Sequence, residues 1–183
     1  MTLSTMIEDF KKPLHAIEQV QIENSARYVL EALKKNCSVF ICGNGGSGAN
    51  ANLFAASMSK IVMDSCNIRV ISLNSNMAII THVAESMNYI NIFSKQIANL
   101  AHDSDLLIAI SGSGNSPNIL EAVATAKALG MYTIGLTGMG GGKLSSMVDF
   151  PIAVNSDSME IIETIHTVIL HAISVWVAEK VAE

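Results

Sequence analysis

Short apolar runs alternate with longer helical patterns along most of this chain. Five short runs of mainly apolar residues predict strands, at residues 39–42, 68–73, 106–110, 132–137 and 150–154. Apolar residues at helical spacing predict the helices between them, at residues 49–62, 77–85, 89–100 and 118–129. Strands that alternate with helices indicate an α/β fold, in which a parallel sheet carries helices on both faces.

Two further helical segments flank the alternating region. Residues 3–35 have apolar residues at helical spacing, and Pro13 predicts a break or a second helix start within them. The last segment predicts one long helix that is apolar around much of its circumference, as buried helices are. Because no linker interrupts the pattern, we expect a single domain over residues 1–183. It divides into an N-terminal helical segment, an α/β core and a C-terminal helix, at residues 1–36, 37–158 and 159–183.

Composition adds an expectation about assembly and excludes some partners. Apolar residues make up 50% of the chain and charged residues 15%, whereas a typical soluble domain carries roughly a quarter charged residues. We therefore expect some apolar surface to be buried between subunits. The formal net charge of −5 and the scattered basic residues argue against direct nucleic-acid binding. No uninterrupted apolar run reaches the roughly 18 residues of a membrane span, so we expect no membrane partner.

The cysteines indicate a compartment. Cys37, Cys42 and Cys66 are odd in number and show no C-x-x-C spacing. They are typical of reduced thiols and not of a disulfide framework or a zinc site. With no signal-peptide pattern at the start of the sequence, we expect a cytoplasmic protein.

The first candidate site is a glycine-rich loop at residues 43–48, directly after the first predicted strand. A strand, a Gly/Ser loop and a helix together present free backbone N–H groups and a positive helix end to a phosphate. The loop resembles a dinucleotide fingerprint only loosely, since no acidic residue ends the next strand, and it lacks the lysine of a P-loop. A tight turn that needs positive φ is the alternative interpretation.

The second loop, residues 111–116, repeats this arrangement with more hydroxyl groups. Ser111, Ser113 and Ser116 supply three hydroxyls, and Pro117 suits the first turn of a following helix. Neither loop contains Lys or Arg, so neutral donors and helix dipoles would meet the ligand's charge. That chemistry favours a sugar phosphate monoester, and a solvated turn is the alternative. A third glycine cluster, at residues 138–142, is more consistent with a flexible connection.

The long last helix carries polar residues that need partners. Glu163, His166, Thr167 and His171 lie among its isoleucines, and unpaired buried polar groups are costly. One interpretation is a hydrogen-bonded seam between subunits, with His166 as its structural member. The other is acid–base chemistry, for which His and Glu are the usual groups. Glu163 and His171 lie about 12 Å apart along the helix axis, so they need not share one proton path.

Taken together, these residues resemble the SIS (sugar isomerase) domain family, in particular its phosphoheptose isomerases and its relatives that associate with the replication initiator DnaA. The resemblance covers nearly the whole chain. It is carried by residues 42–47, residues 110–116, and Glu163 to His166 with His171 five residues on. It implies a flavodoxin-like, doubly wound parallel sheet of five strands with additional N- and C-terminal helices. It also implies a homotetramer with sites between subunits.

The resemblance further implies which residues meet the substrate. His171 corresponds to a catalytic and metal-binding histidine, and Glu163 stands where these isomerases often have a glutamine ligand. Asn76 stands where they usually have a substrate-contacting aspartate. The residues expected to bind the sugar phosphate come from both loops and the segment after the second strand. They are Asn44, Gly45, Ser47, Asn76, Ser111, Gly112, Ser113, Asn115 and Ser116.

This sequence departs from the family at two positions that carry its chemistry. The isomerases have His-x-x-x-Glu on the helix after the first loop, a zinc-ligand histidine and a glutamate that moves the proton. Here those positions are Leu53 and Ser57. Leucine cannot bind a metal, and serine is a poor general base without a neighbouring one. These departures count against the zinc cofactor that the resemblance implies without excluding it. Glu85 or Glu163, with His171, are the candidates for the missing base.

The leading hypothesis is a sugar-phosphate isomerase that interconverts an aldose and a ketose phosphate, such as sedoheptulose 7-phosphate, through an enediol. Leu53 and Ser57 motivate an alternative, a non-catalytic tetramer that binds a phosphosugar or a regulatory or replication protein partner. A third arrangement is a hetero-oligomer in which a paralogue supplies the missing His-x-x-x-Glu helix.

Overall fold

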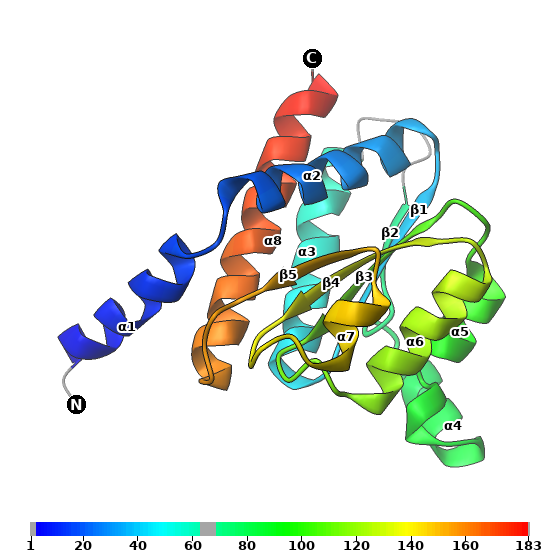
Figure 1. The fold of residues 1–183 in the computed structure, drawn as a ribbon. Helices are drawn as coiled ribbons and strands as arrows, with labels where there is room; N and C mark the ends of the chain where they lie inside the picture. The colour runs from blue at the N-terminus through cyan, green and yellow to red at the C-terminus, as the bar shows by residue number, and fades with distance from the viewer. Residues whose placement is uncertain (1–2, 63–68, 183) are drawn as a thin grey trace.

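A computed structural model describes residues 3–62 and 69–182, and its centre is a parallel sheet of five strands (Figure 1). The order across the sheet is β2-β1-β3-β4-β5. The strands are β1 Ser38–Gly43, β2 Arg69–Ser72, β3 Leu106–Ser111, β4 Tyr132–Thr137 and β5 Phe150–Ala153. This order reverses direction at β1 and β3, as in flavodoxin-like folds. The expected doubly wound parallel sheet is confirmed.

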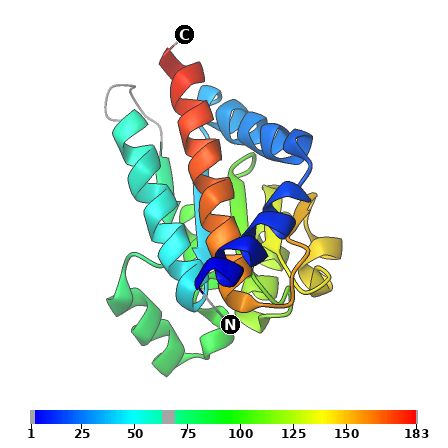
Figure 2. The same cartoon turned by 90° about the vertical axis from the view of Figure 1, so that its left-hand side faces the viewer.

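Helices cover both faces of the sheet. One face is covered by α2 (Gln19–Lys34), α3 (Gly45–Val62) and α8 (Met159–Ala182). The other is covered by α4 (Met77–Ser86), α5 (Ser94–Leu100), α6 (Pro117–Ala128) and α7 (Gly142–Met147), with the short 3-10 helix η1 (Tyr89–Asn91) beside them. The first helix, α1 (Leu3–His15), projects from the α8 side of the body (Figures 1 and 2).

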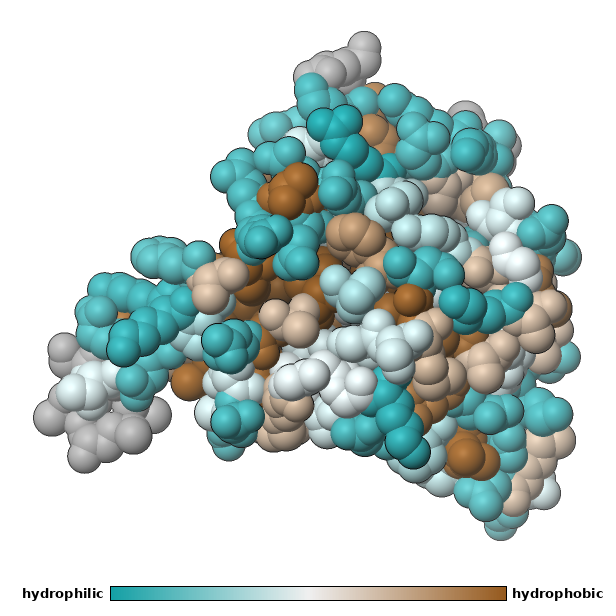
Figure 3. Space-filling model, in the orientation of Figure 1, coloured by the Kyte–Doolittle hydropathy of each residue, from teal (hydrophilic) through white to brown (hydrophobic). Residues whose placement is uncertain are grey.

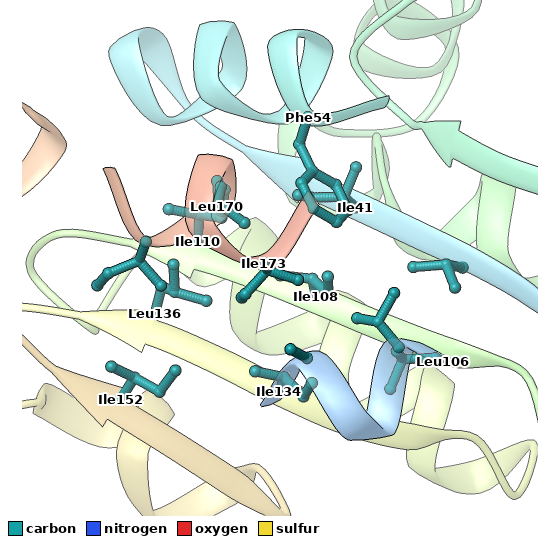
Figure 4. Close-up of a cluster of buried hydrophobic side chains, with 14 of the residues drawn as sticks. Ile41, Phe54, Leu106, Ile108, Ile110, Ile134, Leu136, Ile152, Leu170 and Ile173 are labelled. Atoms are coloured by element: carbon teal, nitrogen blue, oxygen red, sulfur yellow. The ribbon is translucent and has the colours of Figure 1, made fainter. Parts of the chain in front are cut away.

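The core is divided by the sheet because side chains of a strand point alternately to its two faces. Ile41 and Ile108 are register partners on β1 and β3 and face α3 and α8. Phe54 from α3 and Ile173 from α8 complete this side (Figure 4). The intervening residue Phe40 packs with the helices of the other face. Strands that bury both faces explain why their sequences are almost continuously apolar.

The length and apolar composition of α8 would suffice to cross a membrane between Met159 and Val181. In the fold, however, its isoleucines Ile162, Ile165 and Ile169 are buried against the sheet. The apolar sequence of α8 is therefore explained by its place in the core.

Three helix boundaries differ from the predictions, and one of them is the start of α3, which lies at Gly45 and not at residue 49. The break in the first segment falls at residues 16–18, and Pro13 lies inside the last turn of α1, where the lost backbone donor affects few hydrogen bonds. The helix predicted at residues 89–100 is instead η1 followed by α5, because the chain turns between them.

Candidate functional site

The first glycine-rich loop leads straight from β1 into α3. Gly45 takes the left-handed conformation with φ of 54° and begins the helix. The hydrogen bond from Gly48 N to Asn44 O, 3.2 Å long, closes the turn. The amide N–H groups in the first turn of α3 therefore have no hydrogen-bond partner within the helix, and they lie at its N-terminal end. Together with the helix dipole they form the expected anion-binding end.

The loop is held by a residue that the sequence analysis did not single out. Asn74, just after β2, accepts a hydrogen bond from Gly43 N at 3.1 Å and donates one to Gly43 O at 2.8 Å. Its side chain thus pairs with the backbone at the end of β1 as a neighbouring strand would. The signal in the sequence was the polar segment after β2, in which the sequence analysis singled out Asn76 and not Asn74.

The second loop lies beside the first, because β1 and β3 are neighbours in the sheet. Ser111 Oγ donates to Ser116 Oγ at 3.1 Å across the loop. Ser116 precedes α6 but makes no capping bond with its side chain, so its own proton is available to a ligand. Gly114 has φ of 64°, a conformation that glycine adopts readily.

The third glycine cluster is part of this architecture, and its interpretation as a flexible connection is wrong. Gly138 N donates to Gly112 O at 2.9 Å, and Leu144 N donates to Gly114 O at 2.9 Å. A Cβ atom on Gly114 would meet the backbone of Gly141. The cluster therefore packs directly under the second loop and supports it.

A cavity of about 210 Å³ opens between the two loops and the start of α8. Seven of its ten lining residues are serine, asparagine or glycine. The lining residues are Asn44, Gly45, Ser47, Ile110, Ser111, Gly112, Ser113, Ser116, Met159 and Glu163. Glu163 is the one ionisable side chain among these described residues. The structure thus brings most of the predicted phosphosugar-binding residues together around one cavity.

The position of Glu163 depends on a glycine of the first loop. A Cβ atom on Gly46 would overlap the Glu163 carboxylate. Because glycine has no Cβ, the carboxylate can lie directly against the backbone of Gly46. Asn50 Nδ2 on α3 donates to Glu163 O at 2.8 Å, and Thr167 Oγ1 donates to Asn50 Oδ1 at 2.7 Å. These bonds hold α3 against α8 at the helical turn that carries Glu163.

Besides His171, three predicted residues have their side chains outside this cavity's lining. Asn115 braces the loop, with its amide donating to Ser113 O and accepting from Lys143 N. Asn76 caps α4, because its Oδ1 accepts from Ala78 N and Ile79 N. Glu85 is exposed on α4. Their expected roles in binding or catalysis stay predictions.

His171 faces a second, much smaller cavity of about 10 Å³ between α3 and α8. Leu53 and Ser57 line it together with His171. The two residues that replace His-x-x-x-Glu therefore lie beside the histidine that was expected to be catalytic. A leucine side chain offers no electron pair to a metal, and zinc sites need N, O or S ligands. Within residues 3–62 and 69–182, no three His, Cys, Asp or Glu side chains gather closely enough to hold a metal ion. The donor set does not fit zinc.

His166 is the buried histidine of the polar stripe on α8. Its Nε2–H donates to Thr137 O, 3.1 Å away at the end of β4. Its Nδ1 is the one buried side-chain polar atom of the described residues without a hydrogen-bond partner. Burial lowers the pKa of His166 to about 4. The ring is therefore neutral at ordinary pH and ties α8 to the sheet of the same chain, not to a second subunit as the seam interpretation expected.

Comparisons with known proteins give matches over most of the chain. The SIS domain family model matches residues 6–138. The phosphoheptose isomerase of Helicobacter pylori strain P12 is 34% identical over 165 residues, covering 90% of this chain and 85% of that protein. The structure of a phosphoheptose isomerase from Francisella tularensis is 32% identical with a TM-score of 0.88, covering 98% of this chain and 100% of that one. The phosphoheptose isomerase structure from Neisseria gonorrhoeae is 29% identical with a TM-score of 0.88, covering 96% and 98% of the two chains.

Proposed function

The chain belongs to the SIS domain family, and we propose that it is a sugar-phosphate isomerase that interconverts an aldose and a ketose phosphate such as sedoheptulose 7-phosphate. Its relatives that carry the phosphoheptose isomerase name match over most of their length. The observation that carries the proposal is the Glu163 carboxylate, which faces the same cavity as the hydroxyl-lined loops.

The loops bind the phosphate end of the substrate. Ser47 lies in the first turn of α3, and Ser111, Ser113 and Ser116 surround the opposite side of the cavity. Hydroxyls and backbone N–H groups donate to the phosphate oxygens, while the N-terminal end of α3 supplies a favourable dipole. Hydrogen bonds to a charged group are each worth about 1.5–3 kcal/mol.

Glu163 acts as the general base in this proposal. It removes the proton from the carbon beside the carbonyl, giving an enediol, and returns that proton to the neighbouring carbon. The carbonyl and hydroxyl oxygens exchange a proton in the opposite sense. The reaction is redox-neutral overall and needs no co-reactant. His171 is the expected acid–base partner for the oxygens, and it lies in the smaller cavity two turns further along α8.

The chemistry proceeds in this proposal without a resident metal, because Leu53 and Ser57 replace the donors. These substitutions also motivated the non-catalytic alternative. The isomerase relatives do not favour that alternative, and neither does the carboxylate placed at the phosphate cavity.

The working form in this proposal is a homotetramer in the cytoplasm. An exposed apolar strip supports assembly: Leu53 on α3, with Val168 and Val175 on α8. Figure 3 shows further hydrophobic surface where α1 leaves the body of the protein. Cys37 and Cys42 are free thiols, which suits a reducing compartment, and Cys66 lies outside the described residues. A protein partner remains part of the alternative function.

The test is turnover by the purified protein of sedoheptulose 7-phosphate and a panel of pentulose phosphates. Wild-type protein is expected to isomerise at least one of them, and to keep its rate after treatment with EDTA. Glu163→Gln is expected to lose about 10²–10⁴-fold in kcat, the usual contribution of a general base. It should still bind inorganic phosphate in calorimetry, because the loops are unchanged.

Two controls make the outcome specific. Glu160→Gln removes an exposed carboxylate one turn earlier on α8 and should leave kcat unchanged. Ser116→Ala should weaken phosphate binding by about 10-fold or more, since it removes a hydrogen bond to a charged group. The proposal fails if no sugar phosphate is turned over, or if Glu163→Gln isomerises as fast as wild type.

A further inference from the structure

A network of three side chains is built around Asn44, which lines the phosphosugar cavity. Asn44 in the first loop and Asn118 on α6 form a reciprocal amide pair. Asn44 Nδ2 donates to Asn118 Oδ1 at 2.9 Å, and Asn118 Nδ2 donates to Asn44 Oδ1 at 2.8 Å. Tyr89 OH, from η1, donates to the same Asn44 Oδ1 at 3.2 Å. The network thus links the first loop to α6, the helix that follows the second loop, and to η1.

The hydrogen-bonding capacity of Asn44 is nearly exhausted by this network. An amide oxygen accepts two hydrogen bonds and an amide nitrogen donates two. The oxygen of Asn44 already accepts from Asn118 and Tyr89, and one of its N–H groups is bound to Asn118. One N–H group is left for a ligand. Asn44 can therefore donate to a bound sugar but cannot accept from one of its hydroxyls.

Tyr89 has the complementary capacity. Its proton is committed to Asn44, so its phenol oxygen retains acceptor sites. The side chain is 54% exposed, although its hydroxyl reaches a residue that lines the cavity. An exposed ring whose hydroxyl is held by a cavity-lining residue suits the polyhydroxylated part of a substrate whose phosphate is bound between the loops.

We propose that Tyr89 recognises the sugar chain of the substrate, its phenol oxygen accepting a hydrogen bond from a sugar hydroxyl while Asn44 donates to a neighbouring oxygen. This inference rests on the proposed function for the identity of the ligand as a phosphorylated sugar. Asn118, which is 2% exposed, is a positioning residue that holds Asn44 in the orientation required. The site thereby distinguishes a sugar phosphate from phosphate alone.

The test compares two ligands on one variant. Tyr89→Phe keeps the ring and removes the hydroxyl. Binding of sedoheptulose 7-phosphate, measured by calorimetry, should weaken about 5–10-fold, the worth of one hydrogen bond. The dissociation constant for inorganic phosphate should not change, because Tyr89 is not among the residues that line the cavity between the loops. In turnover, KM should rise by a similar factor with kcat nearly unchanged. Tyr28→Phe, on α2 and outside the cavity lining, should alter neither ligand.

Asn118→Ala provides the contrasting result. It removes the amide that holds Asn44, and with it the bonds between the first loop and α6. Because both ligands depend on the first loop, sugar phosphate and inorganic phosphate should both bind more weakly. The inference is overturned if Tyr89→Phe binds the sugar phosphate as wild type does, or if it weakens both ligands equally. If wild type binds the sugar phosphate through Tyr89 but turns nothing over, the isomerase proposal fails and this inference stands. If wild type turns over and Tyr89→Phe is unchanged, the reverse holds.

Discussion

His166 couples the stability of the fold to pH. Its pKa is about 4 in the folded chain because the ring is buried, whereas an unfolded histidine titrates near 6.5. Above about pH 6.5 both states are neutral and the contribution is constant. Between about pH 6.5 and 4 the unfolded state takes up a proton that the folded state refuses, so stability falls as pH falls. The full loss is about 3 kcal/mol, since one pKa unit is worth about 1.4 kcal/mol.

Urea unfolding between pH 7 and 4 measures this effect. His166→Gln keeps an N–H donor for Thr137 O but carries no titrating group. We expect it to lose stability less steeply than wild type as the pH falls through this window. His102→Gln changes an exposed histidine and should keep the wild-type slope. Parallel slopes for wild type and His166→Gln would show that His166 does not carry the coupling.

At the level of single residues, the sequence predicted the cavity lining better than its supports. Ser47 and Ser111 were identified because glycine and serine after a strand have a local signature. Asn118 and Tyr89 were missed because their partner, Asn44, is 74 and 45 residues away. Which amides meet across two loops is decided by strand order and helix packing, which no local pattern encodes.

Contact between α3 and α8 determines where Glu163, the proposed base, lies, because its carboxylate packs against the backbone of Gly46. Gly46→Ala places a Cβ where the Glu163 carboxylate lies, and the flexible carboxylate would move aside. Alanine in a helix is favoured over glycine by about 1 kcal/mol. We therefore expect Gly46→Ala to keep or raise the melting temperature while kcat falls at least about 10-fold.

A double-mutant cycle separates this effect from a general disturbance of the loop. If Gly46→Ala acts through Glu163, adding it to Glu163→Gln should lower kcat little further, because coupled residues are not additive. Additive losses in kcat would mean that Gly46 serves the loop itself. Inorganic phosphate binding, measured on all four proteins, reports directly on that second role.

The order and type of the elements could be predicted because strands buried on both faces are almost continuously apolar. Phe40 and Ile41 face opposite layers of the core, and both had to be apolar. The turn between η1 and α5 was missed because Ile92 and Phe93 are buried and keep the apolar pattern continuous through it. The third glycine cluster was misjudged for another reason. Its order comes from hydrogen bonds to the second loop, as from Gly138 N to Gly112 O.

The surface of the whole molecule offers a reason for subunits to associate. Leu53, Val168 and Val175 are 52%, 45% and 46% exposed, and they lie on the two helices that frame the cavity containing His171. Val168 and Val175 are seven residues apart and therefore share one face of α8. The chain has few charged residues to keep such a strip solvated. Burial of the strip in an oligomer would remove apolar surface from water, which stabilises the assembly by about 25 cal/mol per Å².

Val175→Asp tests whether this strip holds subunits together. A carboxylate at the centre of an apolar interface would have to be desolvated without a partner, so the variant is expected to dissociate into smaller species. Light scattering after size-exclusion chromatography measures the mass, with wild type expected at four chains. Leu100→Asp, on α5 at the other face of the sheet and 49% exposed, should remain tetrameric.

If the dissociated variant still binds inorganic phosphate but no longer isomerises, His171 needs the assembled form to reach the substrate. A monomeric wild type, or a tetrameric Val175→Asp, would contradict assembly through this strip.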